Sequence, residues 1–227
     1  MTPSQAMPER PEQIIARKRA EVAQAEARRP LHELAAAALQ PRETRNLIAS
    51  LSGPELRLIA EIRRPRGGDE LGSLLFDPRI IAQEFAGAGA AAIAVWTDDP
   101  DVGSEFHLVH RARHYMPLPV ICRDAFVQQY QVYQAWEYDA DAVALPVELV
   151  DDDELQLLMR AAAKLRMEAV PVVRDGFQLE SALAAQARVI CIENRALPGD
   201  PDDLARTEAL APHVPAEVLL ISAYGIS

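Results

Sequence analysis

The sequence contains few of the features that mark membrane or secreted proteins. It has two cysteines in 227 residues, Cys122 and Cys191, each within an apolar run and without a CxxC pattern. We therefore expect buried thiols in a reducing compartment, rather than a disulfide or a zinc site. No apolar run approaches the length needed to cross a bilayer, and the N-terminal MTPSQAMPERPEQ lacks the apolar core of a signal peptide. These absences together predict a cytoplasmic protein.

Positive charge is also scarce. Lysine and arginine number 23 against 34 aspartates and glutamates, which gives a formal net charge of −11. Nucleic acids and anionic membrane surfaces are bound through a basic footprint, so we expect neither as a partner. A small anionic ligand held by a local group of arginines is still compatible with this charge.

Motifs for phosphate loops and metal sites are missing too. There is no GxGxxG, P-loop or nucleophile-elbow pattern, and Gly67-Gly68 is best interpreted as a plain turn. His107, His110 and His114 share one stripe of a predicted outer helix. A solvated face explains them better than a metal site, because metal-binding helices usually pair histidines at i and i+4. The acidic run Asp151–Glu154 opens a helix, where carboxylates cap free amides, and it lacks a full calcium loop.

What the chain does contain is a regular alternation of helix and strand patterns. From Pro11 the residues Ile14, Ile15, Lys18 and Val22 recur at helical spacing, and two shorter helices are predicted before residue 52. Seven apolar strand-like runs follow, with a helical pattern in each gap, at 57–63, 90–96, 118–123, 141–147, 168–173, 188–194 and 217–222. Their starts lie 20 to 33 residues apart, which leaves room for crossover helices and predicts parallel strands. The similar turns at 88–90 and 138–140 are predicted helix C-caps.

Repeated βα units of this kind form either a doubly wound sheet or a closed (β/α)8 barrel. A barrel needs eight strands, and the pattern supplies seven before Ser227. We therefore expect one α/β domain over 1–227, with an N-terminal helical extension at 1–50 and, at 51–227, a (β/α)8 TIM-barrel type that lacks its last βα unit. An open seam between the first and seventh strands would expose two edges, so a second copy or a partner chain could cover it.

Charged residues gather at the carboxyl ends of the predicted strands. In the first run, Glu61 and Arg63 point to the same side because they are two positions apart. The later ends offer Arg123, Asp124, Arg174, Asp175, Glu193, Asn194, Arg195, Ser222, Tyr224 and Gly225. In (β/α)8 proteins these ends hold the site, so guanidiniums meeting two carboxylates suggest a phosphorylated or carboxylated small-molecule ligand. A salt-bridge network without any ligand is the alternative.

The ordered blocks of the chain resemble the indole-3-glycerol-phosphate synthase family. They are IIARKRAEV and RPLHEL for the extra helices, LIAEIRR for the first strand, and then FDPRIIAQEFAGAGAAAIAVWTD, LPVICRDAFVQQYQVYQA, ADAVALPVELVDDDEL, VICIENRAL and VLLISAYGIS. The resemblance implies a TIM barrel that closes and decarboxylates an anthranilate-bearing deoxyribulose phosphate. The product would be indole glycerol phosphate, in tryptophan biosynthesis, and the reaction would need no metal or organic cofactor.

The resemblance also implies roles for individual positions. Glu61, Arg63, Arg123 and Glu193 fall at catalytic positions, and Asn194, Arg195, Tyr224 and Gly225 fall at substrate- or phosphate-binding positions. Several positions depart from the family pattern: Arg63 and Arg123 replace lysines, the second of them the general acid, Val172 a catalytic glutamate, Glu193 an asparagine, Tyr224 a serine and Ala125 a phenylalanine.

These departures predict weak or lost activity. A guanidinium, with a pKa above about 12, cannot usefully give up its proton, and a valine cannot transfer one at all. Losing general acid–base help costs about 10²- to 10⁴-fold in rate. We further hypothesise that Arg63 and Arg123 neutralise Glu61 and Glu193 in a network that holds the mouth together.

Three functions remain open on the sequence alone. The first is a slow family enzyme. The second is a non-catalytic paralogue that binds a phosphorylated small molecule or a partner chain. The third is a different lyase or isomerase that uses Glu61 and Glu193 as a pair of carboxylates.

Overall fold

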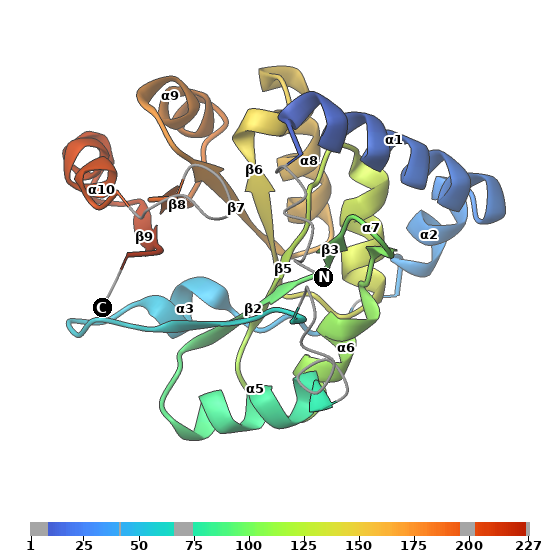
Figure 1. Ribbon diagram of the computed structural model, residues 1–227, viewed down its shortest axis with the longest axis horizontal. Helices are drawn as coiled ribbons and strands as arrows, with labels where there is room; N and C mark the ends of the chain where they lie inside the picture. The colour runs from blue at the N-terminus through green and yellow to red at the C-terminus, as the bar shows by residue number, and fades with distance from the viewer. Residues whose placement is uncertain (1–8, 41, 66–74, 196–202, 226–227) are drawn as a thin grey trace, which may run out of the picture.

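The centre of the computed structural model, which describes residues 9–40, 42–65, 75–195 and 203–225, is one curled parallel sheet (Figure 1). In the described part of the chain its seven strands run in the order β1-β2-β5-β6-β7-β8-β9, and every neighbouring pair is parallel. The strands are β1 Ile59–Ile62, β2 Ala92–Trp96, β5 Val120–Arg123, β6 Ala142–Pro146, β7 Glu168–Val173, β8 Val189–Glu193 and β9 Leu219–Ala223. All seven predicted strand runs are confirmed. The turn predicted at Gly67-Gly68 lies outside the described residues.

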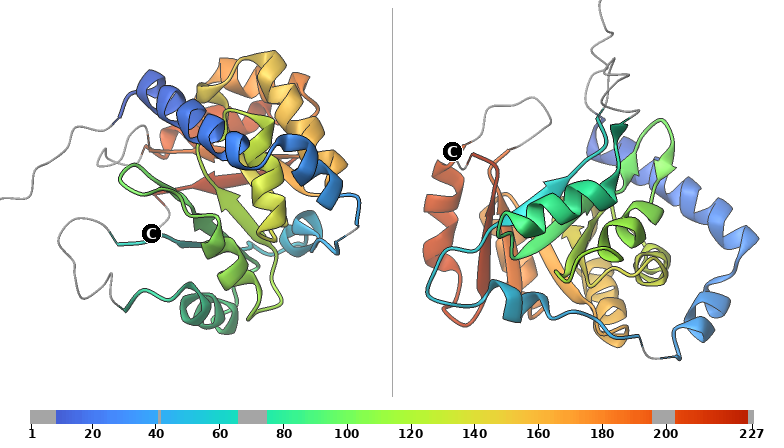
Figure 2. Two further views of the ribbon diagram at one scale, coloured as in Figure 1. Left: turned by 90° about the vertical axis from the view of Figure 1, so that its right-hand side faces the viewer. Right: turned by 90° about the horizontal axis from the view of Figure 1, so that it is seen from below.

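Helices in the connections surround the outside of the sheet, as Figures 1 and 2 show. They are α5 Pro78–Gly87, α6 His107–Arg113, α7 Gln129–Glu137, α8 Asp152–Lys164, α9 Gly176–Ala184 and α10 Ala205–Leu210. The predicted cap of α8 is confirmed, because the Asp151 side chain accepts from the amide of Glu154 at 2.8 Å. The predicted C-caps are confirmed as well: Gly89 and Asp139 adopt φ values of 94° and 67°, the left-handed conformation that ends a helix.

Alternate side chains of the strands feed two different cores. Ile93, Val120 and Ile190 point outward and pack against the helices. The inward side chains, several of them alanines, pack inside the curl; they include Ala92, Ala94, Ala142, Ala144, Val170 and Val172. The predicted buried thiols are confirmed, with Cys122 in the outer core and Cys191 in the inner one, and both are free.

Among the described residues before the sheet there are three helices, as predicted: α1 Pro11–Arg28, α2 Leu31–Ala37 and α3 Leu47–Leu51. Helix α1 lies across the outside against α7 and the short 3-10 helix η1 at Val147–Leu149 (Figure 1). Helix α3 contributes Leu47 and Leu51 to the inner core. A second 3-10 helix, η2 at Ala211–His213, follows α10. A small antiparallel hairpin that the sequence did not predict, β3 Asp98–Asp99 with β4 Gly103–Ser104, follows β2.

Strands β1 and β9 are the two edges of the described sheet. Each pairs with one neighbour within the described residues, so the curl is a half barrel there and not a closed one. The predicted open seam corresponds to these edges, whereas the predicted absence of a last βα unit stays a prediction. Among the described helices, none combines the length and apolar character required to span a bilayer.

Candidate active site

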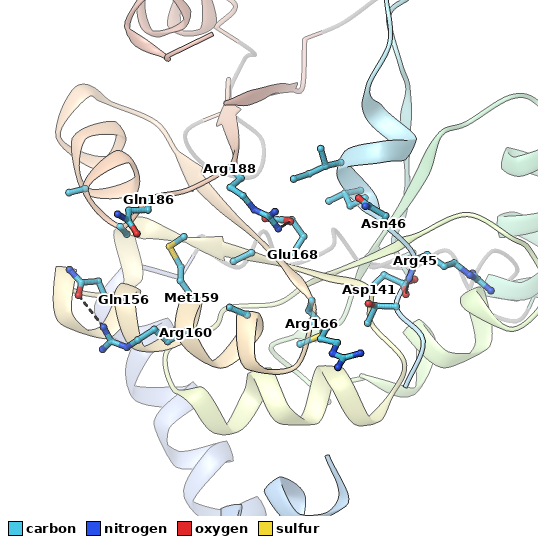
Figure 3. Close-up of a pocket in the computed structure, with 18 residues that line it drawn as sticks. Arg45, Asn46, Asp141, Gln156, Met159, Arg160, Arg166, Glu168, Gln186 and Arg188 are labelled. Atoms are coloured by element: carbon cyan, nitrogen blue, oxygen red, sulfur yellow. Dashed lines mark hydrogen bonds and ion pairs between the residues drawn. The ribbon is translucent and has the colours of Figure 1, made fainter. Parts of the chain in front are cut away.

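Two cavities of similar size compete as the candidate site. The larger, ≈ 870 Å³, lies at the amino ends of the strands and is shown in Figure 3. Its acidic groups already have protein partners: Asp141 accepts from Arg113 and from the amides of Arg45 and Val120, and Glu168 pairs with Arg188. These ion pairs and hydrogen bonds stabilise the amino end of the sheet.

The second cavity, ≈ 770 Å³, opens inside the curl between β1 and β9. Inward apolar side chains such as Ala94, Ile121 and Val172 form its wall. The predicted site residues Glu61, Arg123, Arg195, Tyr224 and Gly225 also line it. Because active sites of parallel barrels lie at the carboxyl ends of the strands, this cavity is the better candidate.

Arg123 is the central charge of this cavity. It ends β5, and its side chain is 11% exposed. One guanidinium nitrogen, Nη1, donates to Glu61 Oε2 at 3.2 Å, and the other, Nη2, donates to Glu193 Oε1 at 2.7 Å. Glu193 also accepts from Arg174 Nε at 2.9 Å, and Arg174 pairs in turn with Glu148 of η1. The hypothesised ion pairs therefore form at Arg123, and they extend to Arg174.

Arg63 departs from the hypothesis. It is exposed, and among the described residues it makes no ion pair with Glu61 or Glu193. Its guanidinium lies 4.7 Å from the centre of the Trp96 ring. Arg63 comes after the last residue of β1, so strand alternation no longer fixes its direction. Its expected part in the carboxylate network is wrong, although it stays beside the cavity mouth.

Cations and aromatic rings alternate across the mouth. The guanidiniums of Arg63 and Arg123 each lie 4.7 Å from the ring centre of Trp96. Tyr224 continues the series, with Arg123 at 5.8 Å and Arg195 at 4.5 Å from its ring centre. Such contacts stabilise a guanidinium and restrict its orientation. Sequence reasoning missed Trp96. A signal was available, because Trp96 ends the predicted strand run 90–96 and points to the same side as Ala94, which lines the cavity.

The buried groups around the cavity hold their protons firmly. Burial would lower the pKa of Arg123, but the charges of Tyr224 and Glu193 raise it above its ordinary value. Burial raises the pKa of Tyr224 to about 12, against the opposing charge of Arg123. Burial likewise raises the pKa of the Cys191 thiol to about 12. None of these three groups changes its protonation near neutral pH, so none is a ready proton donor. Val172, which is buried in the wall, supplies no proton either.

Asn194 lies behind the cavity wall. It is fully buried, and its Nδ2 donates to Ser222 Oγ and to the Tyr224 carbonyl, both at 3.0 Å. Its Oδ1 accepts from the Thr207 hydroxyl at 2.8 Å. The side chain amide is thus used to hold the turn after β9. The structure does not bring Asn194 into the cavity that the other predicted binding residues line.

The turn after β9 has unusual backbone geometry. Tyr224 and Gly225 have φ values of 67° and 74°, so two consecutive residues are left-handed. Glycine tolerates this conformation, but a residue with a side chain is strained by about 1–2 kcal/mol. The Asn194 bonds to this turn and the stacked guanidiniums offset that strain. Tyr224 is thereby held over the mouth.

The other singled-out residues lie away from the cavity. Ala125 is buried with Val127 and Leu149 against α1. Asp175 caps α9 by accepting from the amide of Gln178. His110 Nδ1 lies 2.6 Å from Asp139 Oδ2 on the exposed face of α6. Among the residues that the structure describes, no group of three or more His, Cys, Asp or Glu side chains could hold a metal ion.

Comparisons with known proteins agree with the resemblance of the ordered blocks. The family model for indole-3-glycerol phosphate synthase matches residues 11–227. The indole-3-glycerol phosphate synthase of Acidithiobacillus ferrooxidans is 33% identical over 220 residues, which is 95% of this chain and 83% of that protein. The synthase of a Polaromonas species is 34% identical over the same shares of the two chains. The tryptophan biosynthesis protein TrpCF of Vibrio cholerae is 35% identical over 83% of this chain and 40% of its own.

Solved structures show the fold alone. A 4-hydroxy-2-oxoglutarate/2-dehydro-3-deoxyphosphogluconate aldolase matches with a TM-score of 0.56 at 17% identity, over 81% of this chain and 79% of the aldolase. The sequence matches are more specific than this likeness, and they extend over both the N-terminal helices and the curled sheet. The chain belongs to the indole-3-glycerol phosphate synthase family.

Proposed function

We propose that this chain catalyses, slowly, the ring closure and decarboxylation of carboxyphenylamino-deoxyribulose phosphate to indole glycerol phosphate in tryptophan biosynthesis. Membership of the family supports the reaction, and relatives matched over most of this chain carry the name of that enzyme. The observation that carries the proposal is the cavity at the carboxyl ends of the strands, where Glu61, Arg123 and Arg195 converge. A substrate with one carboxylate and one phosphate suits such an arrangement, since guanidiniums bind both groups well.

In this proposal the residues divide by position. Arg123 binds an anionic or carbonyl oxygen of the substrate and stabilises charge that develops there, with Glu61 and Glu193 fixing its direction. Arg63 and Tyr224 close the mouth around it. Arg195 and Gly225, at the ends of β8 and β9, bind the phosphate, while Asn194 supports that end from behind. The family implies no metal or organic cofactor.

The rate is low because the groups beside the reacting atoms are poor proton donors. Arg123 keeps its proton, and Val172 occupies a position where a carboxylate would be needed. Positioning and charge stabilisation remain as sources of acceleration. The matches to biosynthetic enzymes favour this slow enzyme over a non-catalytic paralogue.

The proposal extends to architecture and location. Residues 1–227 form one domain of (β/α)8 type, with 1–50 as the helical extension. In a complete (β/α)8 barrel an eighth βα unit lies between β9 and β1. A second copy or a partner chain could cover the edges of β1 and β9 in place of such a unit. Light scattering coupled to size-exclusion chromatography distinguishes a monomer from these assemblies. The free buried thiols fit the reducing cytoplasm.

One assay tests the reaction. Purified protein is incubated with carboxyphenylamino-deoxyribulose phosphate, and formation of the fluorescent indole product is followed. We expect product at a rate proportional to protein concentration, and loss of that rate in Glu61→Gln. The control is Glu154→Gln, which alters a carboxylate on α8 away from the cavity. Absence of product at every protein concentration would refute the proposal.

A further inference from the structure

A lysine from the N-terminal extension is buried directly behind the candidate site. Lys18 of α1 has a side chain that is 0% exposed. It occupies the same face of the helix as Val22, the other buried residue of α1. A charged amine in such a place is costly unless it is paired and hydrogen-bonded. Its partners therefore show what the burial achieves.

The Lys18 amine joins two segments that follow neighbouring strands. Its Nζ lies 2.6 Å from Asp98 Oδ1 at the start of β3, two residues after β2, and 2.8 Å from Asp124 Oδ1 directly after β5. It also donates to Ser104 Oγ at 2.8 Å and contacts Glu21 Oε2 at 3.1 Å. A single point charge thus connects the ends of β2 and β5 from outside the sheet.

The same strand ends carry the stacked pair of the cavity mouth. Trp96 and Arg123 are register partners, and they lie inside the curl. Thr97, one residue after Trp96, donates its amide to the Arg123 carbonyl at 2.9 Å and its hydroxyl to Asp124 Oδ2 at 2.6 Å. Trp96 and Arg123 continue the inward positions of Ala94 and Ile121, whereas the Thr97 hydroxyl lies 3.6 Å from Cys122 Sγ in the outer core and bonds Asp124 there. Lys18 therefore stands one residue behind the groups that face the ligand.

The charges in this cluster depend on one another. Burial would lower the pKa of Lys18, but the carboxylates of Asp124 and Asp98 raise it above its ordinary value. Burial would raise the pKa of Asp98, but bonds from Arg17 and Lys18 lower it. Without the amine, the carboxyl groups of Asp98 and Asp124 would face each other in a buried site. Like charges repel there, so the two strand ends would separate or one carboxyl group would take up a proton.

We propose that Lys18 is a positioning residue for the candidate site: by tying Asp98 to Asp124 it fixes the ends of β2 and β5, and through them the stack of Trp96 on Arg123. The kinetic part of this inference rests on the function proposed above, while the structural part does not. The N-terminal extension thereby takes part in the active site without touching the substrate.

The structural test uses the fluorescence of Trp96. The chain has two tryptophans, so Trp136→Phe leaves Trp96 as the single reporter. In that background Lys18→Met should raise quenching of Trp96 by the uncharged quencher acrylamide by at least about twofold, because the ring loses the stacked guanidinium of Arg123 and keeps only that of the exposed Arg63. Lys18→Arg keeps the charge and should restore part of the protection. The measurement is made well below the melting temperature, where a change in global stability alone does not alter quenching.

The matched control is the next residue of the same helix. Arg19 also connects α1 to the rest of the molecule, because its Nη2 lies 2.9 Å from Glu154 Oε1 of α8. This ion pair does not involve the ends of β2 or β5. Arg19→Met should leave Trp96 quenching at the starting value. Equal quenching in the Lys18→Met and Arg19→Met proteins would overturn the proposal, because Lys18 would then serve only to attach the helix.

A second variant covers the case in which Lys18→Met does not fold. Lys18→Met with Asp124→Asn removes one charge of each sign, so the unpaired carboxylate at Asp124 is avoided, and Arg17 still pairs with Asp98 at 2.9 Å. The link that Lys18 makes between Asp98 and residue 124 is still lost, so quenching of Trp96 fluorescence should again rise. Protection of Trp96 equal to that of the parent in this folded double variant would refute the positioning role.

The kinetic test separates positioning from binding. Lys18→Met should lower kcat by about tenfold or more, since small displacements of a group at the reacting centre have effects of that order. The KM should change less than kcat, because Arg195 and Gly225 follow β8 and β9, which are not neighbours of β2 or β5. An unchanged kcat together with raised quenching would overturn the link to catalysis. Absence of turnover in the parent protein would count against the proposed function, while the fluorescence result would still decide the positioning role.

Discussion

The inner strands and the edge strands of the sheet differ in how deeply they are buried. Strands β6 and β8 in the middle are buried along almost their whole length, whereas β1 and β9 at the edges are mostly half-buried. All are short apolar parallel strands, so the difference arises from neighbours: a middle strand has one on each side, and in the described sheet each edge strand has one. The candidate cavity consequently has one enclosed wall and one wall that water can reach.

The ion-pair network of Glu61, Arg123 and Glu193 joins the water-accessible wall at β1 to the enclosed wall at β8. Glu193 on the enclosed wall has a side chain that is 6% exposed, while Glu61 on the edge strand is 29% exposed. Both carboxylates bind the same guanidinium, Arg123. The comparison therefore isolates the effect of burial on two similar ion pairs, and the predictions below use it.

The largest effect is expected at Glu193. Glu193→Gln removes the charge that two guanidiniums, of Arg123 and Arg174, share on the enclosed wall. We expect the free energy of unfolding in urea to fall by about 1.5–3 kcal/mol, because both guanidiniums lose a buried charge-assisted bond and keep only their more exposed partners, Glu61 and Glu148. Glu148→Gln, which changes the half-buried partner of Arg174, should have a clearly smaller effect. A loss at Glu193 no larger than that of this control would contradict the contrast between the walls.

An intermediate effect should appear at high pH through Cys191. A free thiol ionises near pH 8.5, but in the folded chain burial raises the pKa of Cys191 to about 12. The unfolded state therefore releases its proton first, and stability that is complete below about pH 8.5 is lost as the pH rises toward the folded pKa. Above about pH 9, the wild type should lose stability more steeply than Cys191→Ala, by up to about 1.4 kcal/mol per pH unit.

Urea unfolding at a series of pH values measures this difference. Parallel stability curves for the wild type and Cys191→Ala would mean that the thiol reaches water through the open side of the cavity.

The smallest effect is expected at Glu61. Glu61→Gln removes a pair on the edge strand, where water screens the charge, so the free energy of unfolding should fall by less than about 1 kcal/mol. The same variant should nevertheless lower turnover, since Glu61 lines the cavity. Its stability is measured by the same urea titration as Glu193→Gln. A loss as large as that at Glu193 would show that the edge wall is as enclosed as the middle.

The strands and helices were predictable because each has a local cause. Apolar runs such as 168–173 and the acidic cap at Asp151 carry their signal within a few residues. The pairing of Arg123 with Glu61 and Glu193 also followed, because all three lie near the carboxyl ends of parallel strands. Strands β1, β5 and β8 are not neighbours in the sheet, but its curl brings these ends together around one cavity. Arg63 was misjudged because it lies just beyond the end of its strand.

Other features depend on contacts between distant parts of the chain. Lys18 recurs at the helical spacing of the N-terminal pattern, but its carboxylate partners Asp98 and Asp124 lie far along the sequence. Only the packing of α1 across the strand ends brings them together. Asn194 was misjudged for the same reason. Its place after β8 predicted contact with a ligand, but in the fold its side-chain amide bonds Ser222 and the Tyr224 carbonyl and so holds the turn after β9.

The most direct measurement concerns the proton held by Arg123. If a guanidinium that cannot release its proton limits the rate, Arg123→Lys should raise kcat for conversion of carboxyphenylamino-deoxyribulose phosphate by about tenfold or more, because an ammonium group can act as an acid. The circular dichroism spectrum of the variant should match that of the wild type. An unchanged or lower kcat in a natively folded Arg123→Lys protein would show that proton transfer at this position does not limit the reaction.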